Sequence, residues 1–550
     1  MRSFVYIKND EVLPLPDEIE ILDTPLDEEV LISNDKKQKA LIFAPEINFY
    51  LKNSKDNTLQ KSKNILKLYE AREHIYNFGL DLEQEKNIGN KIILADINEN
   101  LASFLKQHNF EVLCLKEDEI LAIFGCVGEL CAIVKNANEE YELDFDILLF
   151  KTKERADFLR QSGCYNYENF KDEVELLEFL QSKSPRYFYK NYIMYDSNIC
   201  QYHQRRTEHC AKCAELCPTT AILKNDEKKE LEFSQIDCLG CGACISVCPS
   251  GSLDYAPLPR ESFFKLTTLY QKQKILIIPK KMDLENLVLD LPEDVLPLMI
   301  EGEKVLSALH FLTLLQSSGA NLVFYTDVVS EGSGEAIFLL NAIFKRKFNQ
   351  TAVWVAKDKI ELQNALQKLE FIENLSFDFH NNTLTTRENF AKGLEHLIDK
   401  DDLGVVPSGE WLRYGEIKIN PNTCTLCLSC VGACNVGALI ADSKENALKF
   451  NASLCTTCGY CETSCAEKDT LELLRNGIKL NSSYFNFHTL AKDELFKCIE
   501  CGKEFATSKA VQKIANLMKP RFLGDETKIK SLYCCADCKA KVMIAAMRKI

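Results

Sequence analysis

The chain has 550 residues, of which 46% are hydrophobic and 27% charged, an ordinary globular composition with enough length for about three or four domains. Its formal net charge of −15 argues against nucleic acid as a partner, because phosphate binding requires concentrated Lys and Arg. It lacks an apolar run long enough to span a membrane, and its first ten residues lack a secretory pattern, so we expect a soluble cytoplasmic protein without membrane insertion.

Residues 1–195 have the sequence pattern of an α/β domain. The stretch 91–115 is typical of a strand, a helix and a second strand, with the helix over residues 98–110. Residues 141–150 predict a further strand and residues 171–181 a further helix. This part lacks a ligand motif. Its isolated cysteines are expected to be buried small apolar side chains: Cys114, Cys126, Cys131 and Cys164.

Residues 196–260 form a small cysteine-rich module. Its second half is a complete Cys-x-x-Cys-x-x-Cys-x-x-x-Cys run followed by Pro249, and its members are Cys238, Cys241, Cys244 and Cys248. In such a run the first three thiolates bind one [4Fe-4S] cluster and the fourth binds the neighbouring cluster. Clustered cysteines in a cytosolic chain indicate metal ligation rather than disulfides. The spacing therefore predicts adjacent iron–sulfur clusters.

The first half of this module departs from the run at one position. Three cysteines occupy the last three ligand positions: Cys210, Cys213 and Cys217. The first position holds Thr207, which does not bind iron as a thiolate does. We predict Cys200 as the substitute, because the cost of closing the intervening loop grows only slowly with its length. The alternatives are His203 or His209 as the ligand, or a site that is empty or holds three irons.

Residues 261–405 return to the α/β pattern. The predicted core strands are residues 274–279, 321–326 and 351–356. Residues 303–319 predict a helix that ends at Gly319. The domain contains no cysteine, which excludes iron–sulfur ligation and leaves docking, spacing or small-molecule binding as its roles. Gly332 and Gly334 lie between a predicted strand and helix, where a plain turn is favoured over an anion-binding loop because the third glycine of the dinucleotide fingerprint is missing.

Residues 415–475 form a second cysteine-rich module with two complete runs. The cysteines of the first run are Cys424, Cys427, Cys430 and Cys434, and those of the second are Cys455, Cys458, Cys461 and Cys465. Because the fourth cysteine of each run crosses to the other cluster, one cluster is predicted to use Cys465 and its partner Cys434. Such small modules are expected to fold together with their metal.

Residues 490–550 contain a different kind of site. Two cysteine pairs separated by some thirty residues predict a tetrahedral zinc site, with the ligands Cys498, Cys501, Cys535 and Cys538. Cys534 is the alternative to Cys535, although the Cys-x-x-Cys spacing prefers Cys535. A rubredoxin-like iron site is the rival, but only one of the two pairs has the glycine that a rubredoxin places after each pair.

The four cysteine runs closely resemble those of bacterial dicluster ferredoxins, over about 110 of the 550 residues. They depart from that family at Thr207, and at Asn435 and Ala466, where a proline would follow the fourth ligand. The resemblance implies single-electron transfer through up to four [4Fe-4S] clusters. The expected fold class is then multidomain α/β plus α+β, with two ferredoxin-like dicluster modules inserted between α/β domains and a C-terminal zinc-binding tail.

The whole chain is similar to the large cytoplasmic 4Fe-4S proteins of epsilonproteobacteria that are associated with formate dehydrogenase. The order of an imperfect module containing YHQRR, a complete second module and a cysteine-paired tail carries this resemblance. It implies electron delivery to a molybdenum or tungsten enzyme, or maturation of such an enzyme.

Three function classes follow from these motifs. We rank an electron carrier for a redox enzyme first and an accessory or maturation factor with structural clusters second. A catalytic subunit ranks last, because the sequence has neither a complete dinucleotide fingerprint nor a convincing acid–base constellation.

Overall fold

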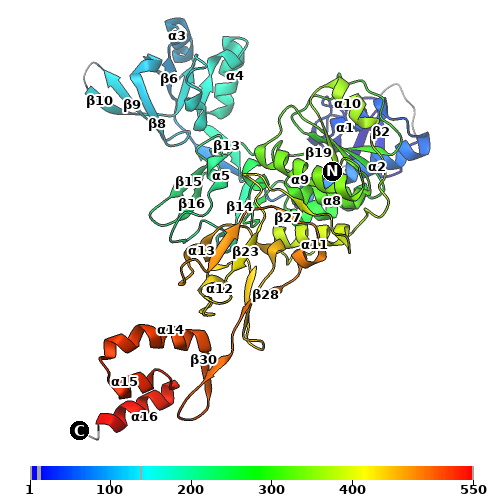
Figure 1. The fold of residues 1–550 in the computed structure, drawn as a ribbon. Helices are drawn as coiled ribbons and strands as arrows, with labels where there is room; N and C mark the ends of the chain where they lie inside the picture. The colour runs from blue at the N-terminus through cyan, green and yellow to red at the C-terminus, as the bar shows by residue number, and fades with distance from the viewer. Residues whose placement is uncertain (1–2, 9–13, 137–138, 548–550) are drawn as a thin grey trace. The chain divides into compact units, whose positions relative to one another are not determined.

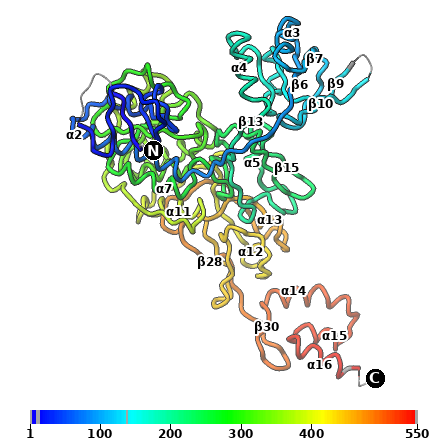
Figure 2. The backbone as a smooth tube through the Cα atoms, turned by 180° about the vertical axis from the view of Figure 1, so that it is seen from behind, coloured from blue at the N-terminus to red at the C-terminus, as the bar shows by residue number. Residues whose placement is uncertain are grey.

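The computed structural model describes residues 3–8, 14–136 and 139–547. The chain divides into two compact units, residues 1–337 with 351–382, and residues 338–350 with 383–550. The first unit contains three parallel sheets and the first cysteine-rich module, and the second contains the other module and the C-terminal region (Figures 1 and 2).

The first parallel sheet lies at the N-terminus. Its order is β2-β1-β3-β4, and its elements are β1 (Phe4–Ile7), β2 (Ile19–Leu22), β3 (Val30–Ser33), β4 (Ala40–Phe43), α1 (Pro45–Asn53) and α2 (Thr58–Phe78). Both helices pack against β19 (Val295–Ile300), and α2 also packs against α7 (Arg260–Thr267). The Asn53 side chain donates to the Leu287 carbonyl and accepts from the Leu289 N–H. Helices α1 and α2 therefore pack with residues 260–300. The sequence boundaries 1–195 and 261–405 do not predict this grouping.

The second parallel sheet has the order β12-β11-β6-β7. Its elements are β6 (Lys91–Ala95), α3 (Glu99–Gln107), β7 (Glu111–Leu115), β11 (Ile147–Phe150), β12 (Cys164–Asn166) and α4 (Glu173–Lys183). One face packs on α3 and α4, and the other on an antiparallel sheet of β8 (Ile120–Phe124), β9 (Leu130–Asn136) and β10 (Glu139–Phe145). A ribbon of β5 (Glu83–Asn87) and β13 (Arg186–Lys190) adjoins it.

The elements predicted over residues 91–115 and 171–181 are confirmed. The single strand predicted over residues 141–150 is wrong, because β10 and β11 are separate strands in different sheets. They are divided at Asp146, whose carboxylate accepts the backbone N–H groups of Gly89 and Lys91 and so turns the chain between the two sheets.

The third parallel sheet has the order β19-β18-β20-β21. Its other elements are β18 (Lys274–Pro279), α8 (Ala308–Ser318), β20 (Leu322–Tyr325), α9 (Glu331–Lys347), β21 (Val353–Ala356) and α10 (Lys359–Leu366). The three predicted strands are confirmed. Every residue of α8 is buried, and the helix ends at Gly319, whose φ of 72° places it in the left-handed region that glycine adopts without strain.

Gly332 and Gly334 lie in the first turn of α9 rather than in the turn that the sequence predicted. A Cβ atom on Gly332 would meet Ser246 Oγ at 2.4 Å and the Ser246 carbonyl carbon at 2.8 Å. Beside Gly334 the nearest atom is 3.6 Å away. Gly332 therefore permits close packing of α9 on the first cysteine-rich module, which explains a glycine here without an anion.

The two cysteine-rich modules repeat one plan. The first pairs β14 (Ile193–Tyr195) with β17 (Leu253–Tyr255) and β15 (Ile222–Asn225) with β16 (Glu230–Phe233), and it contains α5 (Lys212–Glu215) and α6 (Ala243–Ser246). The second pairs β23 (Glu416–Ile419) with β26 (Leu471–Leu474) and β24 (Leu439–Asp442) with β25 (Ala447–Phe450), and it contains α12 (Ser429–Ala433) and α13 (Tyr460–Thr463). Two short ladders thus hold two short helices in each.

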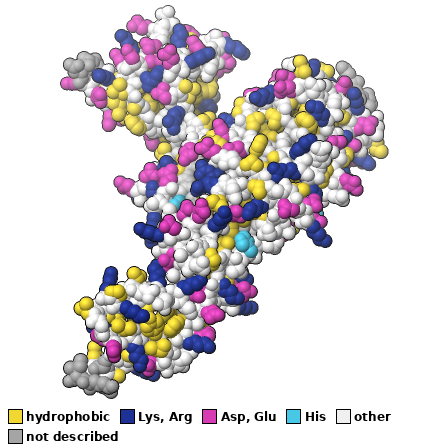
Figure 3. Space-filling model, viewed as in Figure 1, with side chains coloured by type: hydrophobic (Ala, Val, Ile, Leu, Met, Phe, Trp, Pro, Cys, Tyr) yellow, Lys and Arg dark blue, Asp and Glu magenta, His cyan; other side chains and the backbone are white. Residues whose placement is uncertain are grey.

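The second unit adds elements around its module. These are α11 (Thr386–Ile398), β22 (Val405–Val406), β27 (Ile478–Lys479), β28 (His488–Lys492), β29 (Leu495–Lys497), β30 (Glu504–Thr507), α14 (Ser508–Met518), α15 (Glu526–Ser531) and α16 (Ala536–Met547). The C-terminal region has little apolar core. Among its described residues, a buried cluster consists of cysteines with Phe505 and Val542 against them, whereas Ile514 and Leu517 are more than half exposed. Figure 3 shows hydrophobic side chains on the surface of this region.

The start of α14 is fixed to the second module by hydrogen bonds. Lys509 Nζ donates to the Pro421 carbonyl at 2.5 Å, and Thr507 Oγ1 donates to the Thr425 carbonyl at 2.8 Å. Lys513 also forms an ion pair with Glu467. These contacts lie beside Cys424 and Cys465 in the chain.

Candidate metal centres

Four cysteines of the first module line one cavity. They are Cys200, Cys210, Cys213 and Cys248. Burial, together with the neighbouring Cys248 and Cys200 thiols, raises the pKa of Cys210 to about 11. Thiols that raise one another's pKa in a buried cavity are held neutral at ordinary pH, and a bound cation removes this cost by taking the thiolates as ligands.

A second cavity lies in the same module. Its cysteines are Cys217, Cys238, Cys241 and Cys244. Burial and then the charge of Cys213 raise the pKa of Cys244, so the two cavities are neighbours. The fourth cysteine of each run thus faces the cavity of the other run: Cys217 joins the later three and Cys248 the earlier ones.

The second module groups its thiols in the same crossed way. Burial raises the pKa of Cys430 to about 12, with further contributions from Cys424, Cys427 and Cys465. The thiols that act on Cys461, after burial, are Cys455, Cys458 and Cys434, followed by Cys430. Cys465 is therefore a neighbour of Cys430, and Cys434 is a neighbour of Cys461.

Backbone conformation shapes the loops that carry these cysteines. Leu426 and Leu428 have φ of 51° and 60°, and Thr457 and Gly459 have 51° and 94°. Left-handed residues at alternate positions coil the loop, so that its N–H groups turn inward. One of them, the Thr457 N–H, donates to Cys455 Sγ at 3.3 Å. Such N–H to sulfur bonds favour the thiolate and tune a metal bound to it.

Cys200 lines the same cavity as Cys210, Cys213 and Cys248. It is 7% exposed, and its Sγ accepts the Tyr202 N–H at 3.4 Å, as Cys455 does from Thr457. Thr207 is exposed and hydrogen bonds His209 Nε2 at 2.8 Å. Neither His203 nor His209 lines the cavity.

Comparison with known families identifies the domains that contain these cavities. Residues 189–252 match one family model described as a 4Fe-4S dicluster domain, and residues 416–466 match another with the same description. The chain contains two 4Fe-4S dicluster domains. A search of the curated proteins found no match. Each cavity of the first dicluster domain has four thiols, the ligand set of a [4Fe-4S] cluster, and the domains support an iron–sulfur electron-transfer protein.

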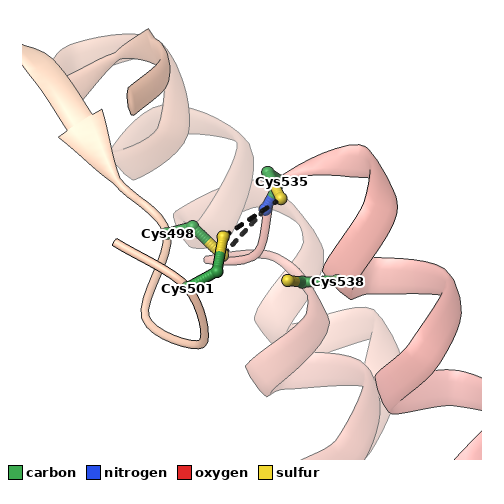
Figure 4. Close-up of side chains that lie close together, drawn as sticks. All are labelled: Cys498, Cys501, Cys535 and Cys538. Carbon is green, nitrogen blue, oxygen red and sulfur yellow. Dashed lines mark hydrogen bonds between the residues drawn. The ribbon is translucent and has the colours of Figure 1, made fainter. Parts of the chain in front are cut away.

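The C-terminal cysteines form a second type of site outside the dicluster domains. The Sγ atoms of Cys498, Cys501, Cys535 and Cys538 all lie within 4.8 Å of one another, and Figure 4 shows the two pairs facing each other. Cys501 Sγ and Cys535 Sγ are 3.7 Å apart. Four sulfurs at a Zn–S distance of about 2.3 Å around one ion would be about 3.8 Å apart, so the spacing suits a tetrahedral metal.

Helix α16 supplies half of this site. Cys535 immediately precedes the helix and Cys538 lies in its first turn. Burial tends to raise the pKa of Cys498, but hydrogen bonds from backbone N–H groups, first that of Cys535 at 3.3 Å, lower it to about 6. Cys534 donates instead to the Lys530 carbonyl at 3.4 Å and is not a member of the four-sulfur group.

The remaining cysteines are less uniform than the sequence predicted. Cys164 is buried, and burial raises the pKa of its thiol. Cys114 is exposed, so the prediction of burial is wrong there, because β7 is an edge strand of its sheet. Cys126 and Cys131 are partly exposed, and Lys86 Nζ donates to Cys126 Sγ at 3.3 Å.

None of the helices in the described part of the chain combines the length and the apolar character that crossing a bilayer requires.

Proposed function

We propose that this chain is a polyferredoxin-like electron carrier that passes single electrons through four [4Fe-4S] clusters. The observation that carries the proposal is the crossed grouping of thiols, visible in two separately lined cavities of the first dicluster domain. A bound [4Fe-4S] cluster supplies reversible one-electron chemistry, and closely spaced clusters pass electrons between them.

The proposed ligand sets are four cysteines for each cluster. In the first domain they are Cys200, Cys210, Cys213 and Cys248 for cluster I, and Cys217, Cys238, Cys241 and Cys244 for cluster II. In the second domain they are Cys424, Cys427, Cys430 and Cys465 for cluster III, and Cys434, Cys455, Cys458 and Cys461 for cluster IV. The support is the two cavities of the first domain and the buried thiols whose pKa neighbouring cysteines raise, which are Cys213, Cys244, Cys430 and Cys461.

The chain contributes burial, hydrogen bonds and water exclusion to this chemistry. Backbone N–H groups donate to Cys200 and Cys455, which stabilises thiolate charge. The cavity around Cys200 is otherwise lined mainly by apolar and aromatic groups, among them Tyr195, Tyr202 and Leu253. A site of this kind limits solvent reorganisation when an electron arrives.

We further propose a zinc ion at Cys498, Cys501, Cys535 and Cys538, with a structural role. The C-terminal region has little apolar core, so a metal that joins the chain before β30 to α16 would supply much of its stability. The start of α14 is hydrogen bonded to Pro421 and Thr425. The same ion would therefore also stabilise the contact between α14 and the loop that carries Cys424, a proposed ligand of cluster III.

The proposed partner is a cytoplasmic redox enzyme of the formate dehydrogenase type, on the strength of the whole-chain resemblance. The test is anaerobic purification with iron, sulfide and zinc quantified, followed by electron transfer to or from a purified formate dehydrogenase. A carrier gives reversible reduction and turnover with that enzyme. Binding to the immature enzyme without electron transfer would favour the accessory or maturation role instead.

A further inference from the structure

Arg387 is a buried cation beside the proposed cluster IV. It lies in the first turn of α11, which packs against the 3-10 turn Ala452–Leu454 that leads into Cys455. Its side chain is 5% exposed. Nη2 donates to the carbonyl of Cys455 at 2.9 Å and to that of Arg413 at 2.8 Å. The guanidinium also lies 3.9 Å from the centre of the Tyr414 ring.

Arg387 lacks the counter-charge that buried arginines normally have. Among the residues that the structure describes, no carboxylate lies within 4.0 Å of its guanidinium, and its Nε is buried without a hydrogen-bond partner. The nearby Glu388 carboxylate is occupied by the N–H and hydroxyl of Thr385. Arg72, which is 3% exposed, has the usual arrangement, with Glu46 and Glu301 as its partners.

A buried charge without a partner is expensive, so a negative group is expected close to Arg387. The four thiolates around the proposed cluster IV give that centre a net negative charge, and Arg387 hydrogen bonds the backbone of one of its ligands. The cluster is therefore the missing counter-charge.

The first dicluster domain has a buried acidic residue next to the equivalent cysteine, where the second domain has Leu454. Asp237, which immediately precedes Cys238 as Leu454 precedes Cys455, is 6% exposed. Its carboxylate is held by the Ser162 N–H and the Ser234 hydroxyl. A cation favours the more negative, reduced state of a cluster, and an anion opposes it.

We propose that Arg387 is a positioning residue that serves as the counter-charge of cluster IV and raises its reduction potential. This proposal rests on the proposed function.

The test uses the full-length protein, purified anaerobically, and an EPR-monitored redox titration. Arg387→Gln keeps hydrogen-bond donors for the two carbonyls but removes the charge, and Arg387→Lys keeps the charge. Arg346→Gln is the matched control, since Arg346 also donates to a carbonyl of the second unit, that of Leu403 at 2.9 Å. Iron is quantified in every sample.

In Arg387→Gln, we expect one of the four one-electron components to move to lower potential, by a tenfold or larger change in its electron-transfer equilibrium, about 59 mV for each tenfold. Arg387→Lys and Arg346→Gln should keep the wild-type curve. An unchanged curve in Arg387→Gln with full iron would overturn the assignment of Arg387. If Arg387→Gln loses iron and the titration curve of Arg387→Lys lies at lower potential, the assignment of Arg387 is overturned as well. Absence of iron from the wild-type protein would instead refute the proposed function.

Discussion

Replacing Cys200 tests the least regular of the sixteen proposed iron ligands. Cys200→Ala removes one thiolate from a cavity whose other cysteines are Cys210, Cys213 and Cys248. The remaining three thiolates hold either a three-iron centre or no cluster. With four irons in each of four clusters, the expected iron content falls from about sixteen to between about twelve and about fifteen per chain.

The assay is iron and sulfide determination on anaerobically purified protein, with EPR after oxidation to detect a three-iron signal. Thr207→Ala is the matched control, because Thr207 stands where the regular spacing would place the ligand but is exposed and bonded to His209. Its iron content should equal that of the wild type. Full iron in Cys200→Ala, or loss of iron in Thr207→Ala, would refute the reasoning that places Cys200 at cluster I.

Three further predictions concern packing, the C-terminal metal and pH. Gly332→Ala should lower the free energy of unfolding, measured by chemical denaturation, by about 1–3 kcal/mol, because the added Cβ would meet Ser246 Oγ at 2.4 Å. The control, Gly334→Ala, should be neutral or stabilising. Equal effects of the two substitutions would contradict the proposed close packing at Gly332. Cys538→Ala should abolish zinc binding and speed proteolysis of α14, with iron kept near sixteen; retained zinc would count against the site. Burial, aided by the charge of Arg260, holds the pKa of His310 at about 3, below its ordinary value of about 6.5, so the unfolded chain binds more protons between these values. Stability should therefore fall as the pH drops through this window, by up to about 1.4 kcal/mol per unit, and a His310→Gln variant with the wild-type slope would contradict this.

The sequence predicts features that depend on near neighbours in the chain. The Cys-x-x-Cys-x-x-Cys spacing places three thiols on one coiled loop, as at Cys424, Cys427 and Cys430, because the loop itself sets their geometry. The end of α8 at Gly319 is likewise local, since the left-handed conformation requires a glycine. Continuous apolar runs likewise predict the core strands, because such a run is a property of neighbouring residues.

Features that depend on distant contacts were not predictable in this way. The packing of α1 and α2 on residues 260–300 rests on contacts such as Asn53 with Leu289, which no periodicity reveals. Exposure of Cys114 follows from the edge position of β7, and strand order is a property of the whole sheet. Arg387 lies 68 residues before Cys455, and nothing in its local sequence marks it as a neighbour of a cysteine.

The central claim is that sixteen cysteines hold iron–sulfur clusters. The most direct measurement is iron and acid-labile sulfide per chain after anaerobic purification, with EPR of the dithionite-reduced protein. The account predicts about sixteen irons, about sixteen sulfides and reversible one-electron signals. A folded chain with negligible iron, or with these thiols joined as disulfides, would contradict it.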